Sequence, residues 1–158
     1  MNTIVHTQEQ VRQIVAEELE QARKNISENI EREGKRASGK TQESMVVSVT
    51  DEGKATVGTL SGRSYFGALE TGSKPWATQY KRVPLFFAEI IGDWIADKGL
   101  DLNPFAVATK IMRKGSKQHR DGAITTVYSE EIDATLERIN KRVMGVFDAT
   151  IAEVNQTR

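Results

Sequence analysis

The β-structure expected in this chain is concentrated in one stretch, Met45-Val-Val-Ser-Val-Thr-Asp-Glu-Gly-Lys-Ala-Thr-Val-Gly-Thr-Leu60. Two runs rich in β-branched residues, 45–50 and 55–60, flank the polar turn 51–54, which contains Gly53. β-Branched side chains favour extended backbone, and a glycine in a short turn allows the chain to reverse direction. The stretch therefore predicts an antiparallel β-hairpin.

Long amphipathic helices are predicted on both sides of this hairpin. Thr7 begins a capping-box pattern, after which apolar residues recur every three to four positions through 11–30, and Gly34 is a suitable stop. A second long helix is expected to begin at Ser129 and to carry an apolar stripe through 132–154. We expect these two helices to pack against one face of the sheet and against each other.

Shorter elements are predicted between the hairpin and the last helix. Residues 84–98 have helical periodicity, and Asn103 followed by proline is typical of a helix start, here for a helix reaching Lys114. Residues 117–122 are expected to form a polar, basic loop, and 124–128 could add a strand. The predicted fold class is α+β: a small antiparallel sheet packed with two long terminal helices and two shorter central ones, in a single domain spanning 1–158.

The composition narrows the classes of function. Lys and Arg total 22 and Asp and Glu total 22, which gives zero net charge and argues against general affinity for nucleic acid. The absence of cysteine excludes disulfides and thiolate chemistry. No secretion signal is visible at the N-terminus, and the most apolar window, 83–96, is too short to span a bilayer. We expect a soluble, cytoplasmic protein until it enters an assembly.

Residues 65–76 form the most informative loop of the chain. The segment combines aromatic anchors with a carboxylate, two glycines and a proline, and it ends on Trp76. Glycine permits a turn with positive φ, and proline keeps the preceding residue out of the helical region. We expect a helical turn or short strand followed by a shaped, exposed loop that contacts another protein. The candidate contact residues are Tyr65, Phe66, Leu69, Glu70, Gly72, Pro75 and Trp76.

The same loop resembles a signature of the tailed-phage head–tail connector family, the neck or tail-completion proteins that join portal to tail. The pattern is aromatic-x-x-Leu-Glu-x-Gly-x-x-Pro, matched over 66–75. Three further motifs of that family have similar segments here, in the same order, at 38–45, 91–100 and 108–116. The resemblance covers roughly residues 38–120, and it rests on the order and spacing of motifs that are each short.

The resemblance implies a head–tail connector-like domain and a structural virion protein. Such a protein would form part of the ring that joins the portal to the tail, and it would line or surround the DNA exit path. Its partners would be further copies of itself, portal or adaptor proteins and tail proteins, with non-specific proximity to packaged DNA and no membrane. It would be assembled in the host cytoplasm and located in the virion, without a cofactor and without enzymatic activity.

An alternative comes from residues Gly34 to Thr41, which match the phosphate-loop pattern G-x-x-x-x-G-K-[ST]. That loop binds phosphates when a strand delivers it and a helix N-terminus follows it. Here a charged helix is expected to precede the segment, and a strand is expected to follow almost at once. A flexible, glycine-rich connector is the favoured interpretation, and a small nucleotide-binding protein is the alternative.

Charged residues suggest two further surfaces. Glu89, Asp93 and Asp97 recur every four residues on one predicted helix, whereas Lys110, Arg113, Lys114, Lys117, His119 and Arg120 form a basic cluster. Each set could be a solvated face; the acidic line could border a DNA passage, or the two sets could pair between neighbouring subunits. The basic segment 110–120 could also serve a nucleic-acid-binding regulator. Two histidines, at positions 6 and 119, lack the spacing of a metal site or a hydrolase triad.

Overall fold

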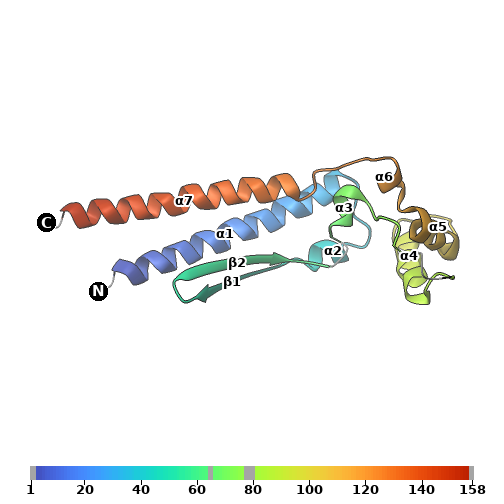
Figure 1. Ribbon diagram of the computed structural model, residues 1–158, viewed down its shortest axis with the longest axis horizontal. Helices are drawn as coiled ribbons and strands as arrows, with labels where there is room; N and C mark the ends of the chain where they lie inside the picture. The colour runs from blue at the N-terminus through green and yellow to red at the C-terminus, as the bar shows by residue number, and fades with distance from the viewer. Residues whose placement is uncertain (1–2, 64–65, 77–80, 157–158) are drawn as a thin grey trace. The chain divides into compact units, whose positions relative to one another are not determined.

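A computed structural model of the chain describes residues 3–63, 66–76 and 81–156. The elements follow in the order α1 (Thr3–Arg32), α2 (Lys40–Glu43), β1 (Val46–Glu52), β2 (Ala55–Ser61), α3 (Ala68–Thr71), α4 (Leu85–Asp97), α5 (Pro104–Lys114), α6 (Lys117–Arg120) and α7 (Ser129–Gln156) (Figure 1). Two long terminal helices, a small antiparallel sheet and shorter central helices confirm the predicted α+β class.

The chain folds into two compact units that alternate along the sequence. The long-helix unit comprises Met1–Asn29, Ser44–Gly62 and Tyr128–Arg158. The short-helix unit comprises Ile30–Glu43 and Arg63–Val127. Within the described residues, no helix combines the length and the apolar character needed to cross a membrane.

The hairpin of the long-helix unit packs one of its faces against α1. Its strands pair in a single register, from Val46 opposite Ser61 to Glu52 opposite Ala55. Gly58 lies on the packed face, where an added Cβ would contact Val15 and would approach Leu19 Cδ1 to 2.7 Å. The absence of a side chain at Gly58 lets the strand come this close to the helix.

Helix α1 supplies most of the core of the long-helix unit. Ile14, Val15, Ala22 and Ile26 are buried along it at the predicted helical spacing. The helix ends where Gly34 adopts a φ of +63°, with the Gly34 N–H donating to the Glu31 carbonyl and the next N–H donating to the Ile30 carbonyl. This pair of bonds is the Schellman arrangement, so the predicted glycine stop is confirmed.

The short-helix unit is built around the contact between α4 and α5. Ala88, Ile91 and Ile95 of α4 and Ala108 of α5 are its buried cluster, with half-buried apolar side chains around them. Helix α5 begins as predicted, because the Asn103 side chain accepts a hydrogen bond of 3.0 Å from the Ala106 N–H and proline follows at the first position.

Two expectations for the segment after α5 are wrong. Residues 117–122 are not entirely a loop: Ser116 caps the single-turn helix α6 by accepting a hydrogen bond from the His119 N–H. Residues 124–128 form no strand. The reason is that the Thr125 N–H and hydroxyl donate to the carbonyls of Glu70 and Leu69, so the local backbone binds α3 and has no β partner.

Candidate interaction surfaces

The structure places most of the 65–76 loop inside the short-helix unit. Tyr65 lies outside the described residues. Phe66 and Leu69 are half-buried, whereas Glu70 and Gly72 are buried. The Glu70 carbonyl accepts hydrogen bonds from the Gln118 side chain and from the Thr125 N–H, which fastens α3 to the segment that follows α5.

Gly72 is the point of closest approach in this loop. Its backbone has φ +73° and ψ 173°, a conformation that is essentially restricted to glycine. A Cβ at this position would lie 2.6 Å from the His119 backbone nitrogen and would also collide with the Ser116 hydroxyl. The expected glycine turn is present, and it serves to pack the loop against α6.

Pro75 and Trp76 remain exposed at the end of the loop. The Trp76 ring meets the Phe87 ring edge-on, with centroids 5.0 Å apart and an interplanar angle of 87°. Its backbone N–H donates to the Met112 carbonyl at 3.2 Å. Trp76 is thus held by α4 and α5 while 39% of its surface is open to solvent. Of the predicted contact residues that the structure describes, this pair is the most accessible.

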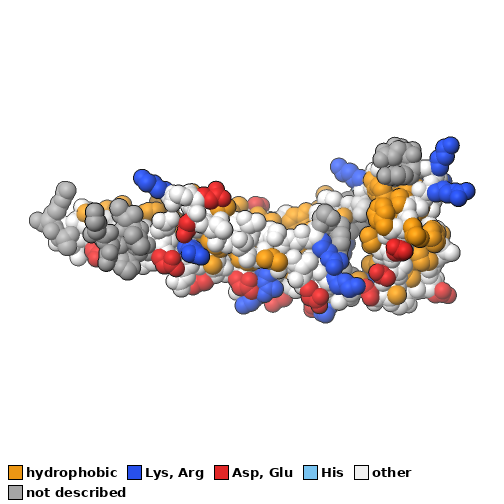
Figure 2. Space-filling view, turned by 90° about the horizontal axis from the view of Figure 1, so that it is seen from below, with side chains coloured by type: hydrophobic (Ala, Val, Ile, Leu, Met, Phe, Trp, Pro, Cys, Tyr) orange, Lys and Arg blue, Asp and Glu red, His pale blue; other side chains and the backbone are white. Residues whose placement is uncertain are grey.

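Helix α4 presents a second exposed surface, on the side away from its buried residues. Phe86, Ile90 and Trp94 follow one another at four-residue spacing and are 58%, 53% and 38% exposed. The predicted acidic line Glu89, Asp93 and Asp97 runs beside them and is exposed as well. We call these six residues the acidic–apolar face. Figure 2 shows hydrophobic side chains gathered over the short helices, with acidic side chains among them.

The carboxylates of this face have no counter-charge within the described part of the chain. Glu89, Asp93 and Asp97 form no ion pair with any residue of 3–63, 66–76 or 81–156. Exposed apolar side chains interleaved with unpaired charges are typical of a surface that binds a partner of opposite charge.

A basic pocket lies on the same unit, at the start of α4 and along α5. It has a volume of about 330 Å³ and is lined by Lys81, Arg82, Val83, Phe105, Thr109 and Arg113. Arg113 was predicted as a site residue, but Lys81 and Arg82 were not. The signal for them is only a basic pair before Val83-Pro84, and the fold is needed to bring that pair to Arg113.

In the rest of the predicted basic cluster, some cations have no ion pair within the described chain and others bind a carboxylate or a backbone carbonyl. Lys110 and Lys114 are exposed and, like the three cations of the pocket, form no ion pair within the described residues. Lys117 lies 3.8 Å from the Asp121 carboxylate, and the Arg120 guanidinium donates to the Gly115 carbonyl at 2.6 Å. Within the predicted cluster, which the structure describes in full, the Lys and Arg side chains with neither an ion pair nor a backbone bond are therefore those on α5.

In the long-helix unit, α1 and α7 run antiparallel and meet through charges. Glu18 is only 8% exposed and accepts hydrogen bonds from Arg138 at 2.7 Å and Arg142 at 2.9 Å. The two arginines also bond to Glu131 and Glu17, each at 2.7 Å. The hydrogen bond from Arg138 lowers the pKa of Glu18, burial opposes this shift, and the bond from Arg142 adds to it.

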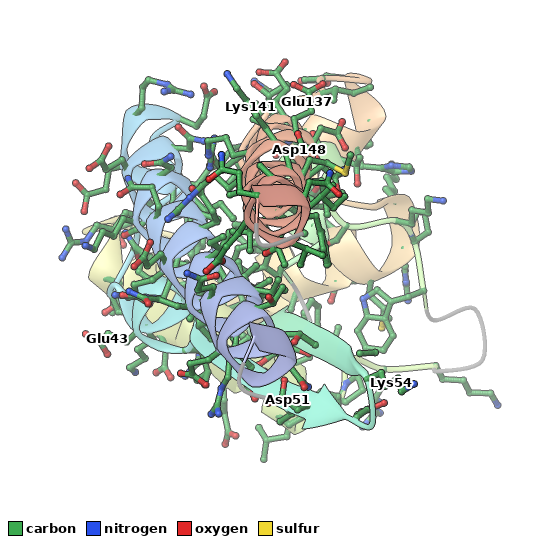
Figure 3. All side chains as sticks on the ribbon, turned by 90° about the vertical axis from the view of Figure 1, so that its left-hand side faces the viewer. Glu43, Asp51, Lys54, Glu137, Lys141 and Asp148 are labelled. Carbon is green, nitrogen blue, oxygen red and sulfur yellow. The ribbon has the colours of Figure 1, made fainter. Side chains whose placement is uncertain are left out.

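Much of the apolar stripe of α7 remains exposed to solvent beside this ionic contact. Half-buried positions such as Ile139 and Val143 adjoin a row of exposed ones, which are Ile132, Leu136, Met144, Phe147, Ile151 and Val154. Glu137 and Lys141 project from the side of α7 away from the hairpin, whereas Asp51 and Lys54 mark the hairpin turn (Figure 3). The long-helix unit thus also carries apolar surface that its own residues do not cover.

The segment from Gly34 to Thr41 lacks the setting of a phosphate loop. It follows α1 instead of a strand, and α2, which begins within the segment at Lys40, contains only four residues before β1 begins at Val46. Arg36 within the segment pairs with Glu31 at 2.6 Å. Among the described residues, no group of three or more His, Asp or Glu side chains could hold a metal ion.

Comparison with models of known protein families, with curated proteins and with solved structures found no match.

Proposed function

We propose that this protein is a structural subunit of a tailed-phage virion, in the ring that joins the portal to the tail and surrounds the DNA exit path. The proposal begins from the ordered motifs between residues 38 and 120, which resemble head–tail connector proteins. It assigns the chain to the virion, with portal or adaptor proteins and tail proteins as neighbours, and it assigns no catalytic role.

The observation that carries the proposal is the pair of unsatisfied surfaces on the short-helix unit. Its acidic–apolar face and its basic pocket are opposite in charge, and neither is neutralised within the described chain. A subunit that carries two different, complementary surfaces can bind copies of itself head to tail, which generates rings when the rotation closes. The exposed stripe of α7 and the exposed Trp76 leave further surface for portal or tail proteins.

The direct test is to locate the protein and to determine its assembly state. Mass spectrometry of purified particles should detect the chain, and electron microscopy with a labelled antibody should place it at the neck. Sedimentation and negative-stain microscopy of the purified full chain should show closed rings, either alone or after addition of portal. Absence from particles, together with a monomer that hydrolyses a nucleoside triphosphate, would refute the proposal.

The exposed cations of α5 favour one alternative, a nucleic-acid-binding regulator. In that case DNA binding should weaken steeply with salt, because phosphate contacts release counterions. Neutralising Arg113, Lys114 and Lys117 should then abolish binding. A nucleotide-binding protein is tested separately: ATP or GTP should raise the melting temperature, and Lys40→Ala should remove that shift. Under the connector proposal neither effect is expected.

A further inference from the structure

We infer that the acidic–apolar face of α4 on one copy binds the basic pocket of a second copy. This inference rests on the proposed ring and names the surfaces that hold it together. It assigns the contact to Glu89, Asp93, Phe86 and Ile90 on one side. On the other side it assigns Lys81, Arg82, Arg113, Val83 and Phe105.

The two surfaces cannot satisfy each other within one short-helix unit. Helix α4 packs on α5 through Ala88, Ile91 and Ile95, and the acidic residues occupy the opposite side of the helix. The described residues contain no ion pair between α4 and the pocket, although both belong to the same unit. The charges must therefore be neutralised by solvent ions or by another molecule.

The composition of the two surfaces identifies the other molecule as a second copy. The face offers three carboxylates beside three apolar side chains, and the pocket offers three cations beside Val83 and Phe105. Phosphate groups of DNA would engage the cations but would leave the apolar walls without a partner. The acidic–apolar face of another copy supplies carboxylates for the cations and apolar side chains for Val83 and Phe105. Such complementarity determines which partner binds and in which orientation.

The contact joins two different surfaces, so it is heterologous. Each bound copy keeps one free face and one free pocket, and addition continues until a ring closes or a filament grows. A variant that has lost one surface can still bind through the other, which makes the inference testable by mixing.

The experiment uses two charge reversals in the full chain, Asp93→Lys and Arg113→Glu. Each variant alone should associate on the order of 10- to 100-fold more weakly than wild type, because like charges then face each other. An equimolar mixture should regain assembly with the two variants alternating, since the intact pocket of D93K accepts the intact face of R113E and the reversed face of D93K pairs with the reversed pocket of R113E. The double variant should regain assembly, because its reversed charges pair again. Asp148→Lys on α7 is the matched control, and it should assemble like wild type.

Cross-linking of cysteine variants tests the same contact under conditions in which the wild-type chain is monomeric. Since the chain has no cysteine, variants Asp93→Cys and Arg113→Cys can be mixed and treated with a short bifunctional thiol reagent. A covalent heterodimer is expected, whereas Asp148→Cys mixed with Arg113→Cys should give none.

Several results would overturn the inference. If wild type forms rings but the D93K and R113E mixture stays monomeric and the thiol pair does not cross-link, this interface is wrong while the ring proposal stands. If Arg113→Glu abolishes DNA binding and leaves self-association unchanged, the pocket serves nucleic acid instead. If the protein is absent from particles, the proposed function fails, whatever the mixing experiment shows.

Discussion

Replacing Glu18 by glutamine should lower the free energy of unfolding of the long-helix unit by about 1–2 kcal/mol. The carboxylate is nearly buried and accepts one hydrogen bond from Arg138 and one from Arg142. Hydrogen bonds to charged groups contribute roughly 1.5–3 kcal/mol each. The expected loss is smaller than the sum of two such bonds because the side chains of Arg138 and Arg142 are 37% and 42% exposed. In the variant Arg138 also keeps its bond to Glu131, and Arg142 keeps its bond to Glu17.

Glu17→Gln is the matched control. Glu17 lies one residue away and bonds to Arg142, but its side chain is 47% exposed. Its replacement should change stability by no more than about 0.5 kcal/mol, as is usual for surface positions. Urea unfolding followed by helical circular dichroism measures the difference. Both tryptophans, Trp76 and Trp94, belong to the short-helix unit, so their fluorescence follows that unit separately.

The effect of Glu18→Gln should also depend on pH. Because the arginines lower the folded-state pKa of Glu18, the carboxyl stays ionised to lower pH in the folded protein than in the unfolded chain. Its stabilising contribution is fully present above the unfolded value of about 4.3 and is lost as pH falls through the folded pKa. The difference in the free energy of unfolding between wild type and Glu18→Gln should therefore become smaller in acid. Equal stabilities at pH 7, or a gap that does not change with pH, would refute this account of the α1–α7 contact.

Three other substitutions test the packing of the fold. Gly58→Ala should cost about 1–3 kcal/mol by forcing a methyl group against Val15, and urea unfolding should show the loss in helical dichroism. Asn103→Ala should cost about 1 kcal/mol through loss of the α5 cap, whereas serine at the same position should be tolerated; tryptophan fluorescence reports this. Gly72→Ala should destabilise the short-helix unit by more than 2 kcal/mol, since it combines a glycine-only conformation with a collision at His119, and near-wild-type stability would contradict it.

Sequence reasoning succeeded where structure is set by neighbouring residues. The hairpin followed from β-branched runs around Gly53, but the turn is shorter than the predicted 51–54, because Glu52 already pairs with Ala55. The start of α5 followed from the chemistry of Asn103, whose side chain caps the helix in the structure. The end of α1 and the start of α4 were predicted to within a few residues, because Gly34 and Pro84 constrain the backbone locally. The predicted start of α1 at Thr7 is wrong, since the helix begins at Thr3 and includes Thr7.

Prediction from sequence failed where residues distant in the chain decide which groups a segment binds. Residues 124–128 have strand-like composition, but their backbone bonds to Glu70, a partner 55 positions earlier for Thr125. The two terminal helices were expected to pack against one face of the sheet and against each other, yet much of the apolar stripe of α7 is exposed. Periodicity identifies an apolar face without identifying what covers it, and the ion pairs at Glu18 decide which side of α7 meets α1. The basic pocket likewise combines Lys81 with Arg113, which only the fold brings together.

The ion pair between Glu18 and Arg138 spans 120 residues of sequence, and this separation affects how the chain is made. Ribosomes add roughly 5–20 residues per second, so a nascent α1 waits for about 6–24 s before its partner helix emerges. During that interval the Glu18 carboxylate has no arginine of α7 to bind, whereas α4 and α5 can already pack on each other. We therefore expect α1 to be the segment most open to chaperones and proteases during translation.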